Sequence, residues 1–241
     1  MQIKYTMKTT KLAIATLLMI SVATSSCKKG CMDDTAENYS SEAKKDDGSC
    51  VYAPTITLNG AATVTISVGD TYSDLGATAQ NADGSTATVT VDESDVNSAA
   101  AGTYTVTYTA SNEHGTAVAM RTVIVEINQS TFIADWDCVS DCSATQFPVD
   151  GTRSLIAGTN SNEFIIDGAF TLVGGQITCQ ISGTTITVPS QTVAVTGGDV
   201  TLSGTGSINA AGTEFTVDFT YDNTIPFVGG TGACTATYTK Q

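Results

Sequence analysis

Apolar residues alternate with threonine and serine along much of this chain, and this period of two constrains the fold more than any other feature. Val64, Ile66 and Val68 flank single polar residues, and the alternation returns over residues 104–110 and 123–127. Successive side chains of a β-strand point to opposite faces, so a strand with one buried face has this pattern. No stretch has a convincing apolar period of 3.6 residues, which an amphipathic helix requires. The sequence therefore predicts an all-β protein.

The expected strands of residues 54–128 are short, and turn residues such as Gly69-Asp70 separate them. Short alternating strands at this spacing predict a sandwich of two sheets. The segment also contains the pattern G-x-Y-x-V-x-Y-x-A-x-x-x-x-G, whose residues are Gly102, Tyr104, Val106, Tyr108, Ala110 and Gly115. With this pattern the segment resembles the bacterial immunoglobulin-like domains of surface proteins, which implies a cysteine-free sandwich that acts as a spacer.

Residues 131–241 form a further domain, in which expected strands are joined by short glycine-containing turns. Consecutive antiparallel strands hide their edges best when the sheet closes, so this segment predicts an antiparallel β-meander that closes into a barrel. Its segments TITVPSQTV and TATYTK are similar to lipocalin-like domains at the C-termini of Bacteroidota lipoproteins. A second sandwich is the alternative fold. The interior of a barrel is expected either to be filled by side chains or to hold a small apolar ligand.

The aromatic residues of this domain lie mostly in the expected strands. This placement favours a role in the core over an exposed platform for glycan stacking. The residues are Phe147, Phe164, Phe170, Phe215, Phe219, Tyr221 and Phe227.

The N-terminal segment has the charge order of an export signal. Three lysines precede the apolar run 12–23, which is too short to cross a bilayer as a helix, so we expect residues 1–26 to be cleaved. The small residues before Cys27 resemble the lipobox of bacterial lipoproteins, in the relaxed form found in Bacteroidota, and this implies that Cys27 carries lipid. The alternative is an ordinary signal peptide that is cut near Ala23.

The number of cysteines supports lipidation. Seven cysteines are an odd number for an oxidising compartment, and a lipidated Cys27 leaves six that can pair. In a closed meander the first and last strands are neighbours, so we expect Cys138 to bond Cys234, which leaves Cys142 with Cys179. The pairing of Cys142 with Cys234 and of Cys138 with Cys179 stays open.

Residues 27–53 comprise the expected lipidated N-terminus and a small acidic module bounded by Cys31 and Cys50. The module resembles a segment of many Bacteroidota secreted proteins that begins with C-x-D-x-x-A-x-N-Y and ends with D-D-G-S-C-x-Y. A loop this short has no core of its own, and a Cys31–Cys50 disulfide would stabilise it by about 3 kcal/mol.

The acidic module also contains oxygen ligands of the type that calcium binds. Their spacing is not that of an EF-hand loop, and Lys44 and Lys45 offset part of their charge. The sequence favours a polar spacer in which carboxylates shape the turn before Gly48, with a calcium site as the alternative. The candidate ligands are Asp33, Asn38, Asp46 and Asp47.

Acidic residues dominate the expected mature chain. After cleavage seven basic and 24 acidic residues remain, which is a formal charge of −17. Such a surface repels nucleic acid and anionic headgroups. We therefore expect no nucleic-acid partner and no membrane contact other than the lipid.

Motifs of the common enzyme classes are absent from the sequence, which has no G-x-S-x-G elbow, no H-E-x-x-H and no phosphate-binding loop. His114 is the only histidine and lies in an expected hairpin turn. Asp218 and Asp222 could form a carboxylate pair for glycoside hydrolysis, but an acidic chain contains such pairs by chance. We expect a protein that is not an enzyme and has no cofactor apart from the candidate calcium.

These features predict a lipid-anchored outer-membrane protein in which a spacer presents a C-terminal domain for binding or for structure. The alternatives are a glycan-binding accessory lipoprotein of a polysaccharide-uptake system and a carrier of a hydrophobic ligand. The expected partners are the membrane, through the lipid, and a glycan or protein at the cell surface. Lys28 and Lys29 directly follow the expected lipid site, and this leaves open whether the protein lies on the periplasmic face or on the cell surface.

Overall fold

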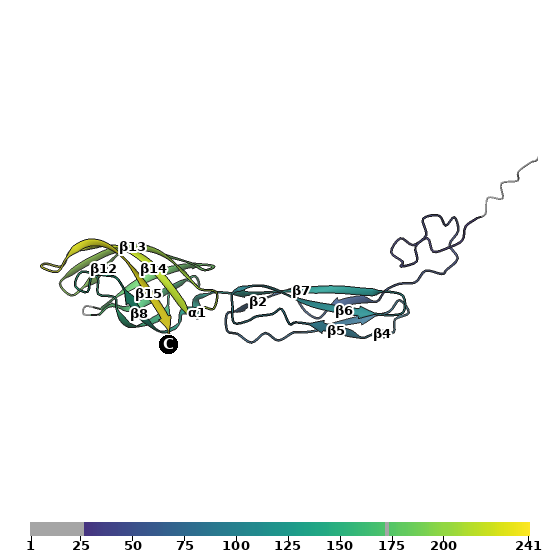
Figure 1. Cartoon of the computed structure of the whole chain (residues 1–241), viewed down its shortest axis with the longest axis horizontal. Helices are drawn as coiled ribbons and strands as arrows, with labels where there is room; N and C mark the ends of the chain where they lie inside the picture. Colours follow the sequence, from purple (N-terminus) through teal and green to yellow (C-terminus); the bar gives the residue numbers. More distant parts are fainter. Residues whose placement is uncertain (1–26, 172–173) are drawn as a thin grey trace, which may run out of the picture. The chain divides into compact units, whose positions relative to one another are not determined.

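The computed structural model of the chain describes residues 27–171 and 174–241, and these residues are almost entirely β-structure (Figure 1). The expected signal peptide, residues 1–26, lies outside the described part. The chain divides into two compact units, one that ends at Val51 and one that runs from Tyr52 to Gln241. The prediction of an all-β protein is confirmed.

Among the described residues, no helix has the length and the apolar character needed to cross a membrane.

The N-terminal unit has isolated β-bridges in place of strands. Among the described residues of this unit, the buried apolar side chains are those of Cys31, Ala36 and Ala43. A disulfide joins Cys31 to Cys50, with their Cα atoms 4.8 Å apart. Because two alanines and one cystine make a very small core, the disulfide is the main constraint on the fold of this unit.

The second unit begins with a sandwich of two sheets. One sheet has the strand order β1-β3-β4, and the other has the order β2-β7-β6-β5, in which β2 runs parallel to β7. The immunoglobulin-like sandwich predicted from the sequence is confirmed. The strands are β1 Thr55–Leu58, β2 Thr63–Ser67, β3 Ala77–Gln80, β4 Thr86–Ala87, β5 Val89–Asp92, β6 Gly102–Ser111 and β7 Thr116–Glu126.

One charged side chain lies inside the sandwich. Arg121 is fully buried, and its guanidinium donates to the carboxylate of Asp74 and to the backbone carbonyl of Ala61. The hydroxyls of Tyr72 and Tyr108 donate to the same carboxylate oxygen, at 2.9 and 2.5 Å. A buried charge is tolerated when it is paired and hydrogen-bonded in this way.

A closed barrel of eight antiparallel strands follows the sandwich (Figure 1). Consecutive strands are neighbours, and β15 pairs with β8 to close the sheet. The predicted closing meander is confirmed, and the alternative of a second sandwich is not found. The strands are β8 Ala134–Ser140, β9 Gly151–Ala157, β10 Glu163–Phe170, β11 Gly174–Ser182, β12 Thr185–Val195, β13 Gly198–Ile208, β14 Glu214–Asn223 and β15 Gly230–Lys240.

A short helix, α1 (Gln129–Phe132), lies at the end of the barrel where β8 begins and β15 ends. The Phe132 ring is buried and stacks on Phe164 of β10, with ring centroids 4.1 Å apart. The indole N–H of Trp136 donates to the carbonyl of Phe132 at 2.8 Å, and Lys240 Nζ donates to the carbonyl of Thr131 at 2.8 Å. These contacts close this end of the barrel with aromatic rings.

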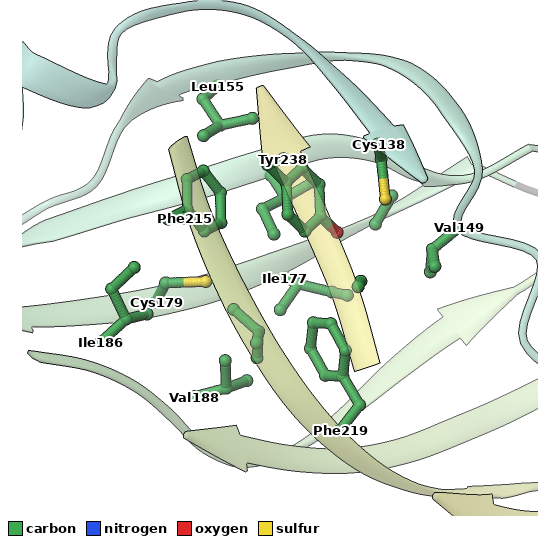
Figure 2. Packing of buried hydrophobic residues seen from close by; sticks show 14 of the residues in the cluster. Cys138, Val149, Leu155, Ile177, Cys179, Ile186, Val188, Phe215, Phe219 and Tyr238 are labelled. Carbon is green, nitrogen blue, oxygen red and sulfur yellow. The ribbon is translucent and has the colours of Figure 1, made fainter. Parts of the chain in front are cut away.

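Side chains of the described residues also fill the middle of the barrel. Figure 2 shows inward-pointing side chains from β11, β12, β14 and β15 that meet inside it. Ile177, Val188, Phe215, Phe219 and Tyr238 are each at most 1% exposed. Of the two arrangements expected for the interior, the structure has the filled one.

Candidate ligand-binding end of the barrel

The four candidate calcium ligands bind backbone groups of the acidic module, the three aspartates within their own turns and Asn38 across the module. Each of the three aspartates accepts a bond from the N–H two residues later: Asp33 from Thr35, Asp46 from Gly48 and Asp47 from Ser49. Asn38 donates to the carbonyl of Ser49 at 2.6 Å and accepts from the N–H of Val51 at 3.1 Å. In the described residues, the three aspartates do not gather as a set of metal ligands. Calcium binding stays a prediction, and these bonds support the turn-forming role.

The downstream cysteines pair differently from the favoured expectation. Cys138 of β8 lies opposite Tyr238 of β15. Continuing this antiparallel register by four residues places Cys142 opposite Cys234, and a disulfide joins these two with Cα atoms 4.9 Å apart. Cys138 lies four strand positions from Cys142, which is about 13 Å along the strand, so it is out of reach of Cys234.

Cys138 and Cys179 are buried free thiols, so neither the expected Cys142–Cys179 bond nor a Cys138–Cys179 bond is present. Burial raises the pKa of the Cys138 thiol to about 11 and also raises the pKa of Cys179. Thiols in this state are poor nucleophiles and poor metal ligands. Cys27, the candidate for lipidation, is exposed.

One group of possible metal ligands in the described residues comprises Asp141, Cys142 and Cys234. Its two sulfurs form the disulfide, so neither is a thiolate that can bind a metal.

The carboxylates considered for glycoside chemistry lie apart. Asp218 and Asp222 are four residues apart on the outer face of β14, about 13 Å along the strand, which exceeds the spacing of roughly 5 to 9.5 Å in glycosidases. His114 lies in the turn between β6 and β7, where its backbone N–H donates to Asn112. Asp218 and Asp222 are therefore too far apart to act as a glycosidase pair, and His114 Nε2 lies 3.5 Å from the exposed carboxylate of the neighbouring Glu113.

A cleft lies at the end of the barrel opposite α1. We call this the loop end, and it comprises the connections 141–150, 196–197 and 224–229, which join β8 to β9, β12 to β13 and β14 to β15. The cleft has a volume of about 170 Å³. Its apolar lining includes Pro148, Phe170, Val200, Ile225 and Val228.

Two buried or half-buried amides hold the connections of the loop end together. Asn223 Nδ2 donates to the carbonyl of Gln146 at 2.7 Å, while Asn223 Oδ1 accepts from the N–H of Ile225 at 2.8 Å. Gln146 Nε2 donates to the carbonyl of Gly229 at 3.4 Å. The Cys142–Cys234 disulfide ties the start of the 141–150 connection to β15. The cleft is thus built on cross-linked loops and exists before any ligand binds.

Phe227 projects from the 224–229 connection into solvent. Its side chain is fully exposed, and its φ of 70° makes it the one non-glycine residue with a positive φ in the described part. A bulky residue rarely adopts this conformation, and such strain concentrates at functional sites. The neighbouring Val228 is 41% exposed. This connection therefore presents apolar side chains at the rim of the cleft.

The assignment of Phe227 to the core is wrong, whereas the other six aromatics of that set are buried. A local signal was present in the sequence. Pro226 cannot donate to a strand ladder, and Gly229-Gly230 follow, so the segment around Phe227 lacks the period of two.

Residues 56–125 match the family described as bacterial surface protein, Ig-like domain. This match covers the sandwich and indicates a protein of the bacterial surface or cell envelope. No curated protein matches the sequence. A crystal structure of a lipoprotein from Bacteroides thetaiotaomicron aligns with 78% of this chain and all of its own, at 15% identity and a TM-score of 0.28. A TM-score this low does not establish a shared fold.

Proposed function

We propose that this protein is a non-enzymatic, lipid-anchored protein of the bacterial outer membrane that binds its ligand at the loop end of the barrel. In this proposal Cys27 carries the lipid, and the immunoglobulin-like sandwich is a spacer. The observation that carries the binding function is the preformed apolar cleft with the exposed Phe227 at its rim.

The filled interior determines which kind of binding fits the barrel. A carrier that encloses an apolar molecule needs a cavity of roughly 300 Å³ or more, whereas the cleft at the loop end has about 170 Å³. The buried side chains of Phe219 and Tyr238 occupy the space that such a ligand would need. This supports binding at the loop end rather than inside the barrel.

Mass spectrometry of the mature N-terminus tests the anchor. We expect a peptide that begins at Cys27 and carries acyl chains, and we expect Cys27→Ser to release the protein from the membrane fraction. A matched Ser26→Ala variant keeps the cysteine and is expected to stay membrane-bound. An unmodified peptide that begins before Cys27 would overturn the proposal.

Glycan binding is the second candidate, and the exposed ring of Phe227 favours it. Aromatic faces at a protein surface provide apolar contact for a ligand that is polar elsewhere. Affinity electrophoresis in gels that contain polysaccharides tests this candidate, with Phe227→Ala as the test variant and Ile133→Ala as an exposed apolar control at the α1 end. Equal retardation of both variants would count against it.

A further inference from the structure

Acidic residues lie around the cleft without an accessible basic residue. Four exposed aspartates belong to the loop end or to the adjacent strand ends: Asp141, Asp150, Asp199 and Asp222. After residue 130 the only basic residues are Arg153 and Lys240. The loop end therefore combines apolar contact area with negative charge.

Neither basic residue offsets this charge at the surface. Arg153 is buried, and its guanidinium donates to the backbone carbonyls of Asp150, Thr152 and Ala169. Lys240 lies at the α1 end, where it binds the carbonyl of Thr131. A cation that approaches the loop end meets no exposed positive charge of the barrel.

Asp150 lies next to the cleft, and Asp199 and Asp222 are linked through the backbone to residues near it or in its lining. Asp150 lines a second hollow, of about 260 Å³, which shares Ala144 and Pro148 with the cleft. The backbone carbonyl of Asp199 accepts from the N–H of Thr224 at 3.0 Å, and Thr224 precedes the cleft residue Ile225. Asp222 directly precedes Asn223, which lines the cleft, and the side chain of Asp222 lies on the outer face of β14.

From this arrangement we infer that the loop end takes a cationic amphipathic peptide segment, in which lysine or arginine alternates with aliphatic or aromatic residues. The inference rests on the proposed binding function of the loop end. The apolar side chains of the segment contact Phe227 and enter the cleft, while its basic side chains face the aspartates. The exposed ring of Phe227 also offers its face to a lysine or arginine. An uncharged glycan would use the ring and leave the aspartates without a role.

Binding of labelled synthetic peptides to the mature chain, residues 27–241 with Cys27→Ser, tests this inference. The probe is a short peptide of alternating lysine and leucine, and the controls are the same peptide with glutamate or with serine in place of lysine. We expect fluorescence anisotropy to detect binding of the lysine peptide only. Binding should weaken as salt is added, because added ions screen the exposed charges.

Two pairs of variants locate the site. Phe227→Ser should weaken binding by about tenfold, as expected for an interface anchor, while Ile133→Ser at the α1 end should leave it unchanged. The double variant Asp199→Asn with Asp222→Asn should weaken binding and flatten its salt dependence. The matched control Glu214→Gln removes an exposed charge from the far end of β14 and should have no effect.

Three outcomes would overturn the inference. Equal affinity for the three peptides would show that charge does not contribute to binding. Equal affinity of the Phe227→Ser and Ile133→Ser variants for the lysine peptide would show that the loop end is not the binding site. Binding of a neutral polysaccharide that depends on Phe227, without binding of the lysine peptide, would replace the peptide by a glycan and leave the proposed binding function intact. If neither the peptide nor the polysaccharide binds, both the peptide inference and the proposed binding function of the loop end are rejected. The lipid anchor is tested separately by mass spectrometry.

Discussion

Arg121 and Asp74 form the one ion pair of the described residues in which the basic partner is fully buried, and both lie in the immunoglobulin-like sandwich. Breaking a buried pair leaves an uncompensated charge, which typically costs about 3–5 kcal/mol. Arg121→Met should therefore lower the free energy of unfolding of the sandwich by about 3 kcal/mol. Hydrogen exchange of the Val106 and Tyr108 amides measures this free energy. The control Glu113→Gln, at an exposed turn, should change the free energy of unfolding by less than about 0.5 kcal/mol.

Acid should weaken the sandwich through the same pair. Desolvation raises the pKa of Asp74, but hydrogen bonds from Tyr108 and Tyr72 and the charge of Arg121 outweigh it, so the pKa lies below the usual value. An aspartate with a lowered native pKa stabilises the fold above its unfolded pKa of about 3.9, and this contribution is lost as the pH falls further. Below about pH 4, stability should thus fall more steeply in the natural protein than in Asp74→Asn. Parallel pH profiles would exclude this role for Asp74.

The all-β fold class could be predicted from the sequence, because a strand with one buried face alternates apolar and polar residues with a period of two. The alternation over residues 104–110 predicted the strand that became β6, whose inward residues Val106 and Tyr108 are fully buried. The Arg121–Asp74 pair carried no such signal, because the two residues are 47 positions apart and only the packed sheets bring them together.

The disulfide pairing of the barrel also could not be predicted from local sequence pattern. Adjacency of the first and last strands was predictable, but the register between them was not. A shift of four residues decides whether Cys138 or Cys142 faces Cys234, and the pairing of Tyr238 with Cys138 sets that register. The loop end was also beyond sequence reasoning, because its cleft is assembled from connections that are distant in the chain.

The Cys142–Cys234 disulfide should contribute substantially to the stability of the barrel. It closes a loop of 92 residues, for which the loop-entropy model gives about 4–5 kcal/mol. The double variant Cys142→Ser with Cys234→Ser should lower the free energy of unfolding by about 3–5 kcal/mol in denaturant titrations that follow Trp136, the only tryptophan, which lies inside the barrel. The matched variant Cys31→Ser with Cys50→Ser alters the other unit and should leave the Trp136 transition in place.

Phe227 should be dispensable for folding. Its side chain is fully exposed and its backbone has a positive φ, so Phe227→Gly removes no core packing and relieves backbone strain of about 1 kcal/mol. The free energy of unfolding should stay within about 1 kcal/mol of that of the natural protein. Phe219→Ala, which removes a buried ring from β14, should instead cost about 3–5 kcal/mol. A large loss in Phe227→Gly would show that the ring packs against the protein.

Cys138 and Cys179 should be present as two unreactive thiols. Both are buried, and burial raises the pKa of Cys138 to about 11, so almost no thiolate is present at pH 8. In the Cys27→Ser protein without reductant, a thiol reagent should detect no thiol in the folded state and two after unfolding in guanidinium. Because the unfolded thiols ionise near pH 8.5, raising the pH above this value should favour unfolding until the native thiols also ionise. Detection of no thiol in the unfolded protein would instead show a Cys138–Cys179 disulfide and contradict the pairing described above.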